Sequence, residues 1–271
     1  VREYLRSLIW DGEKRCETLF IDYLGAEDSR YTRTVTRKAL IGAAARILSP
    51  GCKHDHMLVL IGPQGCRKST TLKKLGKEWF SDSLYTMSGK DAYEQLQGFW
   101  IIELSEMAAT RKAEVEQIKQ FVSKQEDNYR AAYARRTQGH PRQCAFFGTT
   151  NDEEFLRDPT GARRFWPVVV TDAGKTLGDK LTASIVDQIW AEAVTYYEAG
   201  ETWYLDGAVE EMARKVQADH TEANGKLGLI ENFLEVLLPE GWDDWDLEKR
   251  LMFWSGGFGE ERNGTVPRTK V

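Results

Sequence analysis

Residues 58–72 read LVLIGPQGCRKSTTL, in which a run of apolar, β-prone residues ends at Gly62 and a short loop leads into a segment with helical spacing. This order predicts a strand, a glycine-containing loop and the first turn of a helix. Backbone N–H groups of such a loop and the positive end of the helix attract an anion, and Lys68 adds a full positive charge. The stretch therefore predicts a cradle for phosphate groups.

The expected phosphate-loop pattern is G-x-x-x-x-G-K-[ST]. Gly62, Lys68 and Ser69 fit it, but Arg67 stands where the pattern has glycine. If the backbone of Arg67 is left-handed, its side chain costs roughly 1–2 kcal/mol; if the backbone is helical, only the bulk matters. A glycine turn between strand and helix also occurs in α/β proteins that bind no nucleotide, and this alternative stays open. The residues expected to surround a phosphate chain are Gly62, Pro63, Gln64, Gly65, Cys66, Arg67, Lys68, Ser69 and Thr70.

The composition is that of an ordinary globular chain. Its 271 residues are 41% hydrophobic and 29% charged, and a chain of this length can bury a large core. No apolar run approaches the length of a bilayer span and no signal peptide opens the chain, so we expect no membrane partner and a cytoplasmic location. The first residue is Val1 rather than methionine, and we expect a fragment of a longer protein.

Charge and cysteine usage restrict the partners. The net charge is −5, so a nucleic acid would have to meet a local basic patch. The four cysteines show no paired spacing, which suits a reducing compartment better than disulfides or a zinc site. His54 and His56 flank Asp55 without a second ligand cluster, so a polar loop is favoured over a metal site there.

Two further buried strands are predicted, over residues 99–104 and 144–151, and both end in polar groups. Glu103 and Glu106 lie at the end of the first, and ligands bind at the carboxyl ends of strands in open α/β sheets. Beside a phosphate loop, such an acid can bind the water shell of Mg²⁺ or polarise an attacking water. Asn151 would emerge beside it, where an amide can orient a water or contact the γ-phosphate; a simple strand-end turn is the alternative.

Basic residues gather in two places. Residues 128–148 contain no acid, and a turn over 137–141 between two strand-like runs predicts a basic β-hairpin. A solvated loop whose arginines pair with nearby acids is the alternative. Further on, Arg163 and Arg164 stand between a glycine turn and the bulky residues 165–167, which would hold them more firmly than most surface arginines. Helical periodicity dominates before residue 50 and after residue 180, and a short strand is possible over 84–87.

Taken in order, these segments resemble the virulence-associated protein E family over about residues 1–239. The marks that carry the resemblance are residues 50–53 leading to 60–65, then 100–104, 129–136, 148–151 and, most specifically, 160–167. Members are phage- and island-encoded P-loop ATPases similar to superfamily-three and AAA+ motors. The resemblance implies an α/β P-loop NTPase of AAA+/helicase type. We expect a helical segment over 1–52, a P-loop ATPase core with a parallel sheet over 53–170, C-terminal helices over 171–239, and a tail of uncertain structure over 240–271.

The resemblance also implies roles for individual residues. Lys68 would hold the β- and γ-phosphates of ATP, Ser69 and Glu103 would bind Mg²⁺, and Glu106 would assist Glu103. Asn151 would sense the γ-phosphate. One of the paired arginines, Arg163 or Arg164, would reach the nucleotide of a neighbouring subunit in a ring, expected to be a hexamer. The hairpin would face single-stranded or forked DNA through Arg135, Arg136, His140 and Arg142.

Two hypotheses follow. The first is a DNA-stimulated ATPase of helicase type, acting in phage or genomic-island replication. The second is a degenerate P-loop module that binds nucleotide and DNA or partners with little hydrolysis. Arg67 favours the second, whereas the intact Lys68, Ser69, Glu103 and Asn151 favour the first. A P-loop kinase would lack a recognisable acceptor lid and would leave the hairpin unexplained.

Overall fold

The computed structural model describes residues 1–84, 86–105, 112–130, 136–156, 162–221 and 242–255. The chain divides into two units, Val1–Glu222 and Ala223–Val271. The first unit carries every predicted site residue. In the second, the described residues form the 3₁₀ helix η5 (Trp242–Asp244) and the helix α11 (Leu247–Ser255). Residues 222–241, which include the end of the C-terminal helices expected over 171–239, lie outside the described residues.

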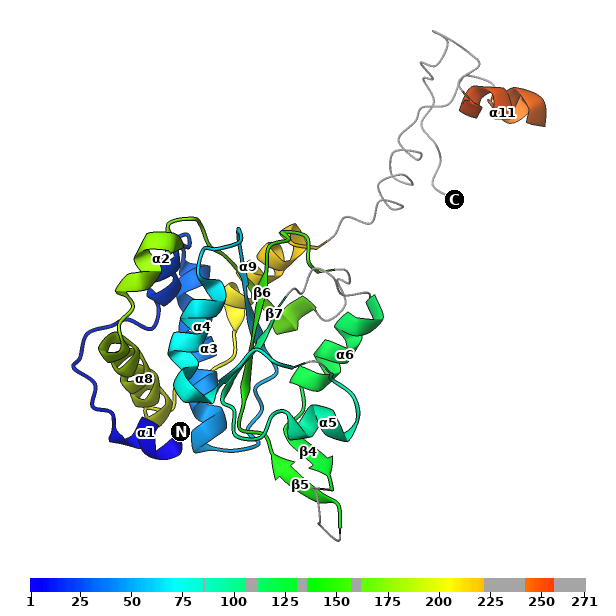
Figure 1. Cartoon of the computed structure of the whole chain (residues 1–271). Coiled ribbons are helices and arrows are strands. Elements are labelled where there is room, and N and C mark those ends of the chain that lie inside the picture. Colours follow the sequence, from blue (N-terminus) through cyan, green and yellow to red (C-terminus); the bar gives the residue numbers. More distant parts are fainter. Residues whose placement is uncertain (85, 106–111, 131–135, 157–161, 222–241, 256–271) are drawn as a thin grey trace. The chain divides into compact units, whose positions relative to one another are not determined.

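Five strands form one sheet in the order β2-β3-β6-β1-β7, and every neighbouring pair runs parallel (Figure 1). The strands are β1 (Met57–Ile61), β2 (Phe80–Ser81), β3 (Ile101–Leu104), β6 (Ala145–Thr150) and β7 (Phe165–Val169). Parallel strands need crossover connections, which here run through helices. The predicted α/β architecture with a parallel core is confirmed.

Helices cover both faces of this sheet. Figure 1 shows α3, α4 and α8 on one side and α5 and α6 on the other. The helices of the first unit are α1 (Arg2–Ser7), α2 (Leu19–Leu24), α3 (Arg30–Leu48), α4 (Lys68–Gly76), α5 (Gly89–Glu94), α6 (Lys112–Val122), α7 (Gly174–Leu177), α8 (Ala183–Glu198) and α9 (Gly207–Asp219), with 3₁₀ turns η1 (Lys77–Trp79), η3 (Ala162–Arg164) and η4 (Gly178–Lys180). No described helix combines the length and apolar composition that crossing a membrane requires.

The alternation of side chains along β1 explains why its whole sequence is apolar. Leu58 and Leu60 pack into the hydrophobic cluster that includes α3, α4 and α8. Met57, Val59 and Ile61 pack into the cluster on the opposite face, with α5 and α6. A strand buried on both faces reads as a continuous hydrophobic run, as in the printed sequence.

The long helix α3 packs on the face of the sheet to which Leu58 and Leu60 point. Ser29 caps it by accepting a hydrogen bond from the Thr32 N–H at 3.1 Å, a common start signal. Midway along it, Gly42 lies against the ring of His54, since a Cβ at Gly42 would come within 2.4 Å of that ring. His54 is buried, and burial lowers the pKa of its imidazole well below the ordinary value, with Arg46 adding repulsion.

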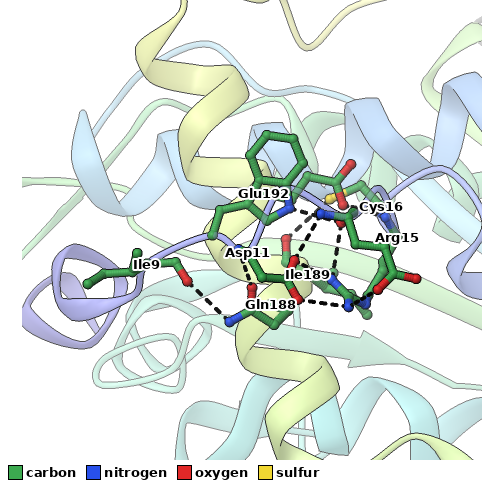
Figure 2. Close-up of polar contacts among 9 residues, drawn as sticks. Ile9, Asp11, Arg15, Cys16, Gln188, Ile189 and Glu192 are labelled. Atoms are coloured by element: carbon green, nitrogen blue, oxygen red, sulfur yellow. Dashed lines mark hydrogen bonds and ion pairs between the residues drawn. The ribbon is translucent and has the colours of Figure 1, made fainter.

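Residues 9–16 cross α8 and are held there by two of its polar side chains (Figure 2). Gln188 donates to the Ile9 carbonyl at 3.1 Å and accepts from the Asp11 N–H at 2.8 Å. The carboxylate of Glu192, which is fully buried, accepts the backbone N–H groups of Arg15 at 2.5 Å and Cys16 at 2.8 Å. This N-terminal segment therefore belongs to the packed structure of the first unit.

The strands β4 (Glu126–Tyr129) and β5 (Gln138–Pro141) form an antiparallel hairpin, which Figure 1 shows extending away from the sheet. A hairpin is present in the predicted region, but its strands differ from the expected ones: residues 138–141, predicted as the turn, form the second strand, and the run over 144–151 belongs to the parallel sheet. Glycine and proline signal a turn locally, yet Gly139 pairs opposite Asn128 in the ladder. A Cβ at Gly139 would meet the Glu126 carboxylate. The strand considered over 84–87 is also wrong for its described residues, since the edge strand β2 lies at 80–81.

Candidate functional site

The turn from β1 into α4 brings the loop of residues 62–67 to the carboxyl ends of the strands. Gly62 is required there because a Cβ would lie 2.4 Å from the Val170 carbonyl oxygen, just beyond β7. Gly65 has a positive φ of 85°, which glycine adopts without strain. The 62–67 loop ends at Arg67, and α4 begins at Lys68. The amino end of a helix thus follows the loop directly, as the sequence predicts.

Lys68 turns its side chain back over the loop. Its ammonium donates to the carbonyl oxygens of Gly62 at 2.5 Å and Pro63 at 3.0 Å, and to Oδ1 of Asn151 at 2.9 Å. The side chain is buried, with 8% of the residue exposed. The predicted lysine and the predicted strand-end amide are therefore in direct contact, although 83 residues separate them in the chain.

Glu103 forms a second polar centre beside the first. Its Oε1 accepts hydrogen bonds from the hydroxyls of Ser69 and Thr149, each at 2.6 Å. The residue is 2% exposed, and its Oε2 has no hydrogen-bond partner among the described residues. An unpaired carboxylate oxygen in a buried position costs free energy, which a bound cation would recover.

Strand order explains this convergence. Strand β6 lies between β1 and β3 and runs parallel to both, so the carboxyl ends of all three strands meet at one edge. Lys68 follows the loop after β1, Glu103 lies one residue before the end of β3, and Asn151 directly follows β6. A cavity of about 480 Å³ opens there, which we call the loop cavity. It is lined by residues 64–70, Ser105, Thr149, Thr150, Asn151 and Lys175.

Arg67 has the left-handed backbone that the pattern's glycine would adopt, with φ 68° and ψ 25°. Of the two possibilities left open for this residue, the strained one is found. Its guanidinium binds the segment after β7, donating from Nε to the Lys175 carbonyl at 3.1 Å and from Nη2 to Asp179 Oδ2 at 2.9 Å. The side chain that departs from the pattern is thus held by two contacts outside the loop.

Arg163 and Arg164 lie at the opposite edge of the sheet from the loop cavity. They end the turn η3, immediately before β7, and β7 starts opposite the start of β1. Arg164 donates to the Ser123 hydroxyl at 2.9 Å. Arg163 lines a separate cavity of about 260 Å³ with His56, whose pKa is lowered mainly by burial. The strands that separate these arginines from the loop cavity span about 16 Å.

The hairpin presents only part of its predicted basic set to solvent. Arg136 is exposed, and His140 stacks on Tyr129 with ring centroids 4.3 Å apart. Arg142 is instead 2% exposed and forms a bidentate pair with Asp127, with a 2.9 Å bond from Nε. The structure therefore does not present Arg142 to DNA as predicted, because its buried guanidinium is paired with the Asp127 carboxylate. Arg135 and Glu106 lie outside the described residues.

Four residues that line the loop cavity are not among the predicted site residues: Ser105, Thr149, Thr150 and Lys175. Thr149 binds Glu103, and its side chain faces that strand only because β6 and β3 are neighbours. Lys175 reaches the cavity from the segment after β7. The polar end of β6, Thr149-Thr150-Asn151, is a sequence signal that points to Thr149. No local sequence pattern points to Lys175.

Comparison with known proteins agrees with this architecture. A family model described as the virulence-associated protein E-like domain matches residues 5–222, and no curated protein matches the chain. Three solved apo structures of the C-terminal region of NrS-1 are similar. The first has a TM-score of 0.50 and 16% identity, covering 86% of this chain and 57% of that one. The other two have TM-scores of 0.47, at 15% and 16% identity, covering 93% and 95% of this chain and 59% and 61% of theirs.

The first of these structures supports a shared α/β fold and, at such low identity, the fold alone. The chain spans about three fifths of the length of these structures, 57% to 61%.

Proposed function

Because the chain belongs to the virulence-associated protein E-like family, we propose that it is a P-loop ATPase that binds Mg²⁺ and ATP in the loop cavity and works in the replication of a phage or genomic island. One observation carries the proposal. Lys68, Ser69 and Asn151 line one cavity at the carboxyl ends of adjacent strands, and Glu103, from a third stretch of sequence, is hydrogen-bonded to Ser69 at 2.6 Å. Ligand sites of open α/β sheets lie at such an edge.

The proposal gives each of these residues a task. Backbone N–H groups of the 62–67 loop and the amino end of α4 would face the phosphates. The Lys68 ammonium would exchange the carbonyl oxygens of Gly62 and Pro63 for phosphate oxygens. Asn151, already in contact with that ammonium, would orient a water for attack or contact the terminal phosphate.

Ser69 and Glu103 fit a divalent cation of the magnesium type. A hydroxyl and a carboxylate are hard oxygen ligands, and Mg²⁺ binds through one or two such groups together with water and substrate phosphates. The two side chains are hydrogen-bonded at 2.6 Å, and the unpaired Glu103 Oε2 supplies a free acceptor among the described residues. Bound there, Mg²⁺ would neutralise charge on the phosphate oxygens. Glu103 would hold the water shell or accept a proton from the attacking water.

A second candidate function keeps binding but not efficient turnover. Arg67 places a side chain on a left-handed backbone and fastens the loop to Asp179. A loop held in this way can bind a nucleotide yet fail to adjust during phosphoryl transfer. The chain would then be a nucleotide-dependent module of a replication complex.

ATP hydrolysis, measured with and without single-stranded DNA, separates these candidates. Lys68→Ala should lower turnover at least 100-fold, and Glu103→Gln should do the same while ATP still binds. Lys73→Ala is the matched control, because Lys73 is exposed on α4. Wild-type turnover equal to that of Glu103→Gln, with ATP bound, would establish the binding module. A wild-type chain that binds no ATP would contradict both.

The proposal also assigns a DNA-phosphate contact to the hairpin, through the exposed Arg136, the half-buried His140 and Arg135, which lies outside the described residues. Arg142 is omitted because it pairs with Asp127. Affinity for single-stranded DNA should fall steeply with salt, since each neutralised phosphate releases counterions. Arg136→Ala should reduce the salt slope by about 1, whereas Arg30→Ala, on the exposed start of α3, should leave it unchanged. A flat response in the wild type would remove the hairpin from the model.

A further inference from the structure

The segment after β7 packs directly on the 62–67 loop. It comprises α7 (Gly174–Leu177) and η4 (Gly178–Lys180). A Cβ on Gly174 would lie 2.4 Å from the Cys66 carbonyl oxygen, and a Cβ on Gly178 would lie 3.0 Å from Cδ of Arg67. Glycine at these two positions allows the segment to approach the loop this closely.

Two basic side chains fasten the segment in place. Arg67 binds the Lys175 carbonyl and the Asp179 carboxylate, at 3.1 Å and 2.9 Å. Lys74, from α4, donates to the carbonyls of Gly178 at 2.8 Å and Leu181 at 3.0 Å. The backbone around Lys175 is therefore fixed by contacts from the loop and from the helix that follows the loop.

The side chain of Lys175 enters the same cavity as Lys68. It lines the loop cavity, and its Cε lies 3.9 Å from where a Cβ on Gly65 would be. Its ammonium pairs with Asp172 at 2.9 Å, but the two side chains are 51% and 62% exposed. An ion pair as exposed as this one contributes little, so a phosphate group can replace the carboxylate.

We propose that Lys175 is a second phosphate-binding lysine of the loop cavity, and that Arg67 is the residue that positions it. The inference rests on the proposed nucleotide site and deepens it. Lys175 supplies a second point charge to the phosphate chain, beside that of Lys68. The strained backbone of Arg67 is retained because the same side chain holds the Lys175 carbonyl.

Calorimetric titration of the full chain with ATP, ADP and AMP, in the presence of Mg²⁺, tests the role of Lys175. Lys175→Gln should raise the Kd for ATP about tenfold, the loss expected for one hydrogen bond to a charged group. The Kd for AMP should change little, because AMP lacks the outer phosphates. Lys175→Arg should restore most of the affinity. Lys180→Gln, an exposed lysine on the same segment, is the matched control and should bind like the wild type.

The positioning role of Arg67 is tested through its partner. Asp179→Asn leaves the loop backbone untouched and weakens the tether. It should raise the Kd for ATP severalfold in the wild type and add nothing when Lys175 is already glutamine, because both changes remove the same interaction. Additive effects would overturn the positioning role.

The outcomes distinguish this inference from the proposed function. A wild-type chain that binds none of the three nucleotides overturns the proposed site and the inference with it. A wild-type chain that binds ATP while Lys175→Gln binds equally well overturns the inference alone. Thermal unfolding of each variant without nucleotide should match the wild type, since Lys175 and Lys180 are exposed.

Discussion

At the scale of single residues, the candidate site contains two groups that lower the stability of the fold. Arg67 occupies a left-handed backbone conformation, and Glu103 buries a carboxylate oxygen that has no partner among the described residues. Neither feature stabilises the fold. Strain and unpaired buried oxygens are typical of sites whose partner is a ligand.

Arg67→Gly should stabilise the protein while weakening its hold on ATP. Glycine removes a strain of roughly 1–2 kcal/mol and loses an exposed ion pair worth at most about 1 kcal/mol. The free energy of unfolding in urea should therefore rise by up to about 1 kcal/mol, whereas the Kd for ATP should rise because Lys175 is released. A large gain in ATP turnover would instead show that the natural loop is impaired.

The buried histidines predict a loss of stability in mild acid. The folded state lowers the pKa of both His54 and His56, mainly through burial, and in the unfolded chain both return to about 6.5. Below that pH the unfolded state binds more protons, so stability that is present above it is lost as the pH falls. For His54, whose folded-state pKa lies well below this value, the slope should reach about 1.4 kcal/mol per pH unit, and His56 adds a smaller contribution of the same sign.

Urea unfolding between pH 5 and 8 measures this slope. His54→Gln should remove about one proton from the linkage below pH 6.5, whatever its effect on stability at neutral pH. An unchanged slope in this variant would show that His54 is not the group responsible.

At the scale of elements, the sequence predicts the helices and strands that have a clear local periodicity. It misses those that form only through pairing with a distant segment. The strands β1, β3 and β6 and the helices α3 and α8 are long apolar or periodic runs, and they occur where expected. The sequence predicts a turn where the second hairpin strand lies, because Gly139 and Pro141 signal one locally and their pairing partners lie ten or more residues away. Strand β2 has two residues and leaves no pattern.

The same distinction applies to the site. The predicted strands lead directly to Lys68, Ser69, Glu103 and Asn151. Because the carboxyl ends of parallel strands lie together, the sequence predicts that these residues are neighbours. Lys175 and the burial of Arg142 depend on the packing of distant segments, which no local motif encodes.

Glu192 should be the main polar anchor of residues 9–16. Its buried carboxylate accepts two backbone N–H groups, and removing a charged acceptor leaves both donors unsatisfied. Glu192→Ala should lower the free energy of unfolding by about 3 kcal/mol. Glu198→Ala, at the exposed end of the same helix, should stay within about 0.5 kcal/mol of the wild type. Equal effects in the two variants would contradict an anchoring role.

At the scale of the whole molecule, the first unit places its proposed chemical groups at opposite edges of one sheet. The loop cavity lies at the carboxyl ends of the strands, whereas Arg163 and Arg164 precede β7 at the other end. A strand length of about 16 Å separates them. If these arginines assist hydrolysis, they must do so in the cavity of another copy.

ATPase activity per chain should therefore rise with protein concentration. An arginine supplied by a neighbour can raise phosphoryl-transfer rates roughly 10³–10⁵-fold. Lys68→Ala disables the cavity, and a variant with alanine at both 163 and 164 disables the arginines, so each should be inactive alone. Mixing the two should restore activity, because an intact cavity can then meet intact arginines. Concentration-independent turnover in a monomer verified by sedimentation would contradict the arrangement.

Strand β6 has a mechanical consequence for this unit. Arg142, just before the strand, is locked to Asp127 at the base of the hairpin, and Asn151 follows its last residue. The strand is hydrogen-bonded to β1 on one side and to β3 on the other, so it cannot stretch or buckle without breaking both ladders. The strand itself spans about 20 Å, so a movement of the hairpin base is passed along a rigid element towards Asn151. The stiffness of β6 therefore determines how closely Asn151 follows a movement of the hairpin base.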